Sequence, residues 1–222
     1  MKAILLPVKE FRHAKKRLAP HFSGMARAEL AAALCEDMFR TVAAVSGQIR
    51  VFVVSAEPRA LDLAQVRGWE TIAETGQVSE SQSVDAASRH CASLGVTALL
   101  RLPIDIPLVE PADIEAILNA VEPAPSAVLV SSRDRTGTNA LLRSPPDLFP
   151  SHFGPGSFAA HLAEAENSGA RVTIVENPRI ALDIDEREDF ANLTRLKPDS
   201  AFARWVALHL PVSGTDRVPP GG

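Results

Sequence analysis

Tyrosine is absent from this 222-residue chain, and cysteine occurs only twice. Cys35 and Cys91 lack the close spacing of a zinc or thiol-redox motif, so we expect buried thiols in a reducing cytoplasm. No apolar run approaches the roughly 18 residues of a membrane span. Lys9 ends the apolar run Ala3–Val8 where a signal peptide would have to continue, which also predicts a cytoplasmic protein outside any membrane.

Several common site motifs are missing as well. The chain has no GxxxxGK(S/T) phosphate loop, no GxGxxG dinucleotide motif, no HExxH metal site and no GxSxG hydrolase turn. A net charge of −4 argues against a nucleic-acid partner, which usually requires a basic surface. The six histidines show no ligand spacing, and we expect them mostly at the surface: His13, His21, His90, His152, His161 and His209.

Short β-branched runs alternate with helical stretches, which predicts an α/β fold. We expect one domain over residues 1–210 and a disordered tail over 211–222. The expected strands cover residues 2–8, 50–55, 70–73, 96–102, 127–132, 171–175 and 180–184, with a further short apolar run at 140–142. The expected helices cover residues 23–47, 58–68, 83–94, 111–121, 186–196 and 201–210, and another opens at 157.

A cationic loop follows the first expected strand. Ligands of open α/β sheets bind beyond the carboxyl ends of the strands, so this position matters. The loop has a formal charge of +4 within nine residues, because only Glu10 opposes its cations: Lys9, Arg12, Lys15, Lys16 and Arg17. Such a loop can hold a polyphosphate and neutralise a pyrophosphate leaving group, or it can be a solvated surface loop.

Asp105 closely follows the run at 96–102, which is apolar enough for a central strand covered on both faces, in the segment LPIDIPL. A carboxylate between Pro103 and Pro107 is costly to bury unpaired, which favours a metal, a cation or amide donors. The alternative is an aspartate that stabilises a local turn.

Asp183 and Asp185 lie two residues apart in the segment LDID, and on an extended strand both would project to the same face. Asp185 with Glu188 also fits the N-terminal cap of the next helix. If this pair converges with Asp105, three hard oxygen donors suit Mg²⁺ with bound phosphates.

Two small-residue turns complete the candidate site. Glycines before a helix allow close approach of an anion to backbone N–H groups, although a simple turn with Ser157 as the N-cap is the alternative. The candidate ligand-binding residues of the two turns are Gly137, Thr138, Asn139, Gly154, Gly156 and Ser157.

In this order, the segments resemble the guanylyltransferases of coenzyme F-420 biosynthesis, with a match from about Lys2 to Asp189. LPVK and AKKRLA are similar to the family's opening, with Lys16 where a serine is usual. LPIDIPL, TGTNALL, FGPGSF and LDID are similar to four later family segments. One departure is ESQSVDAA at 80–87, where the family has a helix start with Gly-Leu-Asn.

The resemblance implies a single-domain nucleotidyltransferase fold related to GT-A glycosyltransferases, with three layers and a mixed, mostly parallel sheet. It implies GTP as a substrate and a site for Mg²⁺, expected as two ions, at Asp105, Asp183 and Asp185. The acceptor would be 2-phospho-L-lactate, phosphoenolpyruvate or 3-phosphoglycerate, bound near Thr138 and the 154–157 turn. The sequence leaves the oligomeric state open, and a homodimer is one option. A downstream transferase that consumes the product is a further possible partner.

The expected reaction is attack by an acceptor phosphate oxygen on the α-phosphorus of GTP, with Lys9, Lys15 and Arg17 as the catalytic cations on the departing pyrophosphate. A phosphate is already largely ionised near pH 7, so no catalytic histidine or serine is required. The alternatives are a sugar-phosphate or molybdopterin nucleotidyltransferase, and a non-catalytic nucleotide-binding module on the same fold.

Overall fold

The computed structural model describes residues 1–76, 79–184 and 189–210. Within these residues, seven strands form one sheet in the order β3-β2-β1-β4-β6-β5-β7. Among the strands that the structure describes, only β6 runs antiparallel to its neighbours β4 and β5, so the expected mixed, mostly parallel sheet is confirmed. The strands are β1 Lys2–Val8, β2 Arg50–Ser55, β3 Glu70–Ala73, β4 Ala98–Arg101, β5 Ser126–Ser131, β6 Thr138–Ser144 and β7 Arg171–Ile174.

Helices connect most of the strands, and side-chain caps begin several of them. Ser23 accepts a hydrogen bond from the Ala26 N–H at the start of α1, and Ser79 caps α3 in the same way. The helices are α1 Gly24–Ala43, α2 Pro58–Val66, α3 Glu80–Ser93, α4 Pro111–Asn119, α5 Ser157–Asn167, α6 Asp189–Leu196 and α7 Ala201–His209. Two 3-10 turns, η1 Phe11–His13 and η2 Lys16–Leu18, lie in the cationic loop.

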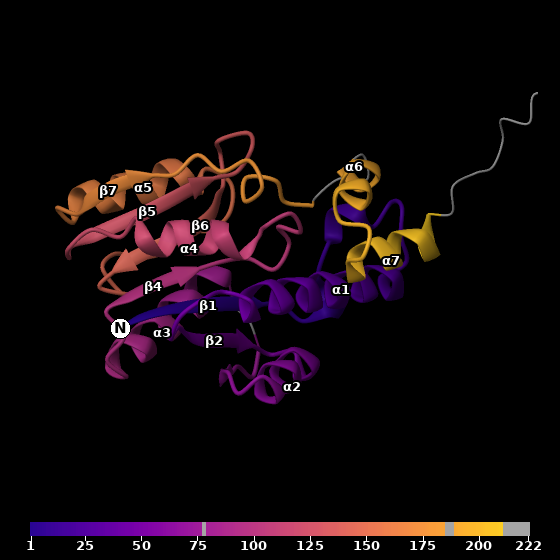
Figure 1. Ribbon diagram of the computed structural model, residues 1–222, viewed down its shortest axis with the longest axis horizontal. Helices are drawn as coiled ribbons and strands as arrows, with labels where there is room; N and C mark the ends of the chain where they lie inside the picture. Colours follow the sequence, from indigo (N-terminus) through magenta and orange to yellow (C-terminus); the bar gives the residue numbers. More distant parts are fainter. Residues whose placement is uncertain (77–78, 185–188, 211–222) are drawn as a thin grey trace, which may run out of the picture.

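The helices cover both faces of the sheet, which makes three layers (Figure 1). Side chains of α1, α2 and α4 pack on one face, and those of α3 and α5 pack on the other. A separate apolar cluster joins the first half of α1 to α6 and α7. Strand β1 runs from the N-terminus toward the end of the molecule at which α6 and α7 lie (Figure 1).

One expected element is wrong. Residues 180–184 form turns and irregular backbone, not a strand. Their hydrogen bonds go singly to different loops: the Arg133 N–H donates to the Ala181 carbonyl, and the Ile184 N–H donates to the Asp105 carbonyl. A chain whose partners change at every bond cannot continue a sheet ladder. The tail at 211–222 lies outside the described residues, and no helix within them is long and apolar enough to cross a membrane.

Candidate functional site

Two adjoining cavities lie at the carboxyl ends of β1, β4 and β5. The first, about 240 Å³, is lined mainly by the cationic loop and by the segment after β4. The second, about 580 Å³, is lined by residues of the 132–139 and 153–157 loops and by Asp183. Five residues line both cavities: Arg17, Glu80, Arg101, Pro103 and Asp105.

The cationic loop contributes side chains of two kinds to the first cavity. Lys9 and Arg17 line it and are exposed, as is expected of groups that would meet an incoming anion. The Lys15 side chain is only 8% exposed, and its Nζ lies 2.8 Å from Asp105 Oδ2. Lys15 also has a left-handed backbone, with φ of 50°. Arg12 pairs with Glu10 and does not line either cavity.

Asp105 is paired, as the cost of burying an isolated carboxylate requires. Burial raises its pKa, but the Lys15 ammonium group outweighs this effect by its charge and its hydrogen bond, and Arg101 adds to it. The pKa of Asp105 is therefore held below its usual range, and the group is a carboxylate at neutral pH. Lys15 Nζ also donates to the Ile184 carbonyl, so it links Asp105 to the loop that carries Asp183.

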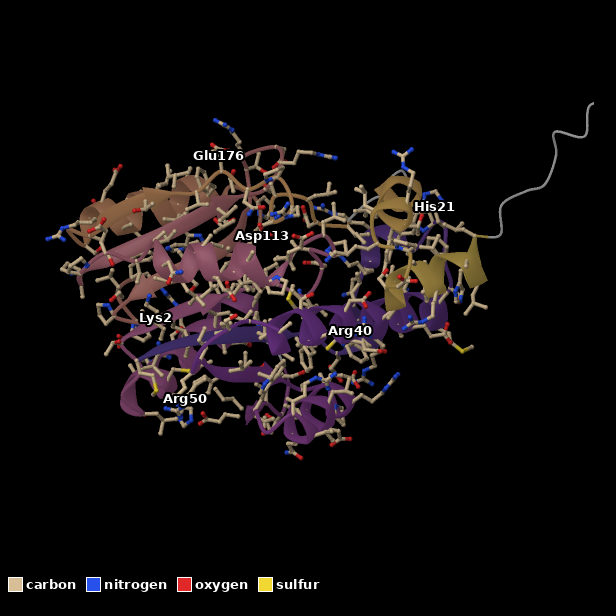
Figure 2. All side chains as sticks on the ribbon, viewed as in Figure 1. Lys2, His21, Arg40, Arg50, Asp113 and Glu176 are labelled. Atoms are coloured by element: carbon tan, nitrogen blue, oxygen red, sulfur yellow. The ribbon has the colours of Figure 1, made fainter. Side chains whose placement is uncertain are left out.

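Asp113 of α4 anchors the segment at 177–179, which leads into the loop that carries Asp183. Arg179 donates to Asp113 through two nitrogen atoms, with Nε to Oδ2 at 2.7 Å, and Asn177 donates to the same carboxylate. Asp113 is buried, and Figure 2 shows it in the middle of the view, with Glu176 near the upper edge. These contacts lower the pKa of Asp113 despite the opposing effect of burial, and they fix the path of the loop.

Asn139 holds the same loop from the sheet side. Its side-chain amide donates to the Ile180 carbonyl at 2.9 Å, and the residue is only 7% exposed. Asn139 lines the second cavity as predicted, but its amide group is used to position the acidic loop.

The expected acidic cluster is described in part. Asp105 and Asp183 line the second cavity together, although the strand that was expected to orient Asp183 is absent. Asp185 lies outside the described residues, as does its expected capping partner Glu188. Within the described residues no group of three His, Cys, Asp or Glu side chains is arranged to hold a metal ion. Two carboxylates beside a cationic loop are nevertheless the hard oxygen donors that Mg²⁺ prefers in phosphate sites.

The two predicted turns meet at the start of α5. The Thr138 N–H donates to Ser157 Oγ at 2.9 Å, and Thr138 Oγ1 lies 2.9 Å from His161 Nδ1. The N-cap of α5 is Gly156, with φ of 75°, so the reading of Ser157 as a simple N-cap is wrong. Gly154 and Ser157 line the second cavity, whereas Gly156, which precedes Ser157 in the chain, is not one of its lining residues.

Position 137 requires glycine because its backbone lies close to the Ser132 side chain. The Gly137 N–H donates to Ser132 Oγ at 2.7 Å, and a Cβ atom at this position would lie only 3.0 Å from that oxygen. Asp134 accepts from Ser132 and Thr136 in the same turn, which lowers the pKa of Asp134 to about 2. This turn sets the position of Thr138 at the start of β6.

Sequence reasoning missed three residues at the site. Arg101 is 5% exposed at the end of β4, where it pairs with Glu80 and lies over the Phe153 ring. An arginine within the apolar run ALLRL was the available signal. Glu80 begins α3 in the segment that departs from the resembled family. His161 is fully buried, contrary to the expectation for the histidines, and nothing in its spacing marked it.

Comparisons with known proteins agree on one family. The chain matches the model of a family described as "Guanylyl transferase CofC like" over residues 1–200. It is 40% identical to a phosphoenolpyruvate guanylyltransferase of Rubrobacter xylanophilus, over 85% of this chain and 91% of that protein. It is 30% identical to a 2-phospho-L-lactate guanylyltransferase of Methanothermobacter thermautotrophicus, over 96% and 95%.

A solved structure supports the fold. A putative nucleotide-diphospho-sugar transferase from Desulfovibrio desulfuricans G20 matches with a TM-score of 0.70 and 15% identity, and the match covers 93% of this chain and 94% of that one. At this identity the likeness concerns the architecture alone.

Proposed function

The chain belongs to the CofC-like family of guanylyl transferases, and from this premise we propose that it transfers GMP from GTP to the phosphate of a three-carbon phosphorylated acid, with release of pyrophosphate. The observation that carries the proposal is the junction of the two cavities at Arg17 and Asp105. The first cavity is lined by four cations of the loop after β1, and the second adds hydroxyl and glycine residues together with Arg133 and Asp183. This division suits a nucleoside triphosphate beside a second phosphate.

We place the polyphosphate of GTP in the first cavity and the acceptor phosphate in the second. Lys9 and Arg17 are exposed cations on the wall of the first cavity and would neutralise the departing pyrophosphate. Lys15, paired with Asp105, would keep the two acidic segments together and contribute the third positive charge. The acceptor phosphate would meet Thr138 and Ser157.

The reaction needs no protein nucleophile. An oxygen of the acceptor phosphate forms a bond to the α-phosphorus of GTP, the bond from that phosphorus to the oxygen bridging to the β-phosphate breaks, and pyrophosphate leaves with the electron pair. The acceptor phosphate, with its second pKa near 6, is largely ionised at neutral pH. The protein's contribution is alignment and neutralisation of charge.

The carboxylates of Asp105 and Asp183 fit a site for Mg²⁺, with Asp185 as the third expected ligand. When bound, Mg²⁺ would neutralise phosphate charge during the transfer. Arg101 and Glu80 line both cavities, so they can contact both substrates.

Among the three acids, we place phosphoenolpyruvate first, because the relative at 40% identity is named for it. 2-Phospho-L-lactate and 3-phosphoglycerate are the other acceptors to test. We further propose that the reaction belongs to coenzyme F-420 biosynthesis, as the resemblance of the sequence motifs to that family implies. A homodimer and a downstream transferase that consumes the product stay predictions.

Pyrophosphate release tests the proposal. Purified protein is incubated with GTP, Mg²⁺ and each of the three acids, with and without EDTA, and with CTP in place of GTP. We expect release with GTP and at least one acid, abolished by EDTA. Arg17→Gln should reduce the rate strongly, whereas Arg12→Gln is a matched control because Arg12 pairs with Glu10 outside both cavities. Release with none of the acids would leave the fold in place and remove the function.

A further inference from the structure

His161 is a fully buried histidine on α5, beside the proposed acceptor site but outside the proposed reaction. It lies one helical turn after Ser157, so the two side chains project from the same face of α5. Its ring packs edge-on against Phe153, with 5.0 Å between the ring centroids. A buried imidazole next to a ligand cavity raises the question of which proton it carries.

A backbone hydrogen bond determines which ring nitrogen of His161 carries the proton. The His152 N–H donates to His161 Nε2 at 2.8 Å, so Nε2 accepts and has no hydrogen of its own. Burial lowers the pKa of His161 to about 3, and the nearby cations Arg143 and Arg101 add to this effect, as does His152. The ring is therefore neutral at pH 7, and its single hydrogen is on Nδ1. Since Nδ1 lies 2.9 Å from Thr138 Oγ1, the imidazole donates and the threonine accepts.

The direction of this bond determines what Thr138 can offer a ligand. A hydroxyl has one hydrogen to donate, and here one of its lone pairs already receives the Nδ1 hydrogen. Ser157 is in the same state, because its Oγ accepts from the Thr138 N–H. No contact among the described residues uses the hydroxyl hydrogen of either side chain. Both residues line the second cavity, so both hydrogens can be donated into it.

We propose that His161 is a positioning residue that makes Thr138 a hydrogen-bond donor toward the anionic phosphate of the acceptor. The inference rests on the proposed function, since the ligand is a phosphate monoester in the second cavity. A threonine hydroxyl without this constraint can turn its hydrogen to other acceptors and present lone pairs to the anion, which repels it. With its oxygen held by Nδ1–H, the hydroxyl keeps the donor orientation.

Three substitutions separate this role from simple packing. His161→Leu fills the space but removes the donor to Thr138. His161→Asn keeps a side-chain N–H near the position of Nδ1, so it is the conservative rescue variant. His152→Gln is the matched control: its side chain is 42% exposed and pairs with Glu164, and the backbone N–H that contacts His161 Nε2 remains.

Kinetic constants for the acceptor and for GTP give the first readout. A hydrogen bond to a charged group corresponds to roughly tenfold or more in affinity, so His161→Leu should raise the KM for the acceptor by about that factor. The KM for GTP should stay nearly unchanged, His161→Asn should recover most of the loss, and His152→Gln should behave as wild type. In a Thr138→Val background, His161→Leu should have no further effect on the KM for the acceptor. Equal effects on both substrates, or full additivity with Thr138→Val, would overturn the proposal.

Two measurements on the protein without GTP separate this inference from the proposed function. Nitrogen-15 NMR of labelled histidine in the wild-type protein should show His161 with a hydrogen on Nδ1 and none on Nε2 near pH 7; the opposite tautomer or a charged ring refutes the inference without any variant. Calorimetric titration with inorganic phosphate should show weaker binding by His161→Leu and recovery by His161→Asn. Wild-type protein that binds phosphate in this pattern but releases no pyrophosphate with any acid would remove the function and leave the inference; no binding of phosphate would overturn the inference.

Discussion

The neutral, buried state of His161 makes a quantitative prediction for stability against acid. In the unfolded chain the imidazole titrates near 6.5, whereas in the folded protein its pKa is lowered to about 3. Between these two pH values the unfolded state binds more protons than the folded state. The free energy of unfolding therefore decreases as the pH falls below 6.5. One pH unit corresponds to about 1.4 kcal/mol for a single group, so lowering the pH from 7 to 5 should cost about 2 kcal/mol through this residue alone.

Urea unfolding of wild-type protein and of His161→Asn at pH 7 and pH 5 measures the effect. The variant lacks the titrating group, so the difference between the two proteins removes the contributions of the carboxylates and the other histidines. We expect the free energy of unfolding of the wild type to fall by about 2 kcal/mol more than that of the variant. Equal losses in the two proteins would show that His161 is not a buried neutral imidazole, and the account of its hydrogen bonds would fail.

Three further predictions concern the site and its supports. Asp105→Asn should nearly abolish pyrophosphate release while circular dichroism stays unchanged, and near-normal activity would refute its assignment as a metal ligand. Gly137→Ala places a Cβ atom 3.0 Å from Ser132 Oγ, so urea unfolding should show a loss of about 1–2 kcal/mol, and an unchanged free energy would refute the close approach. Asp113→Asn weakens the pair with Arg179, which is half-exposed, so we expect a loss of about 1 kcal/mol by urea unfolding and faster proteolysis near residue 180; wild-type cleavage would contradict this anchoring role.

The fold was largely predictable because its elements are local and well marked. Ser23 begins α1 as a cap, and Pro58 and Pro111 stand in the first turns of α2 and α4. The run at 98–100 is apolar on both faces because helices cover both sides of β4. The pairing order of the strands depends on contacts between distant segments. The antiparallel β6 was therefore visible only as a short apolar run, and its place between β4 and β5 was not predictable from the residues.

The candidate site was predictable where the rule for strand ends applies. Lys9 and Asp105 follow the carboxyl ends of β1 and β4, and both line the described cavities. The prediction of a strand at 180–184 was wrong because the segment is an apolar run interrupted only by Asp183, which resembles a strand. In the fold its backbone groups hydrogen-bond one at a time to separate partners: the Arg133 N–H, the Asp105 carbonyl and the Asn139 side chain of β6.

Arg101 and His161 were missed for a related reason. Nothing near them in the sequence explains why a charged or polar side chain is buried, because their partners are distant in the chain: Glu80 and Thr138 for Arg101, and Thr138 and the His152 backbone for His161. A buried polar side chain needs a hydrogen-bond or ion-pair partner, and the fold is needed to identify that partner.

Phosphorus-31 NMR of the reaction mixture tests the central claim most directly. The account predicts that GTP and phosphoenolpyruvate yield a product with two mutually coupled phosphorus signals, one from GMP and one from the acceptor, together with free pyrophosphate. Formation of GMP or GDP with the phosphoenolpyruvate signal unchanged, or no reaction with any of the three acids, would contradict the proposed transfer.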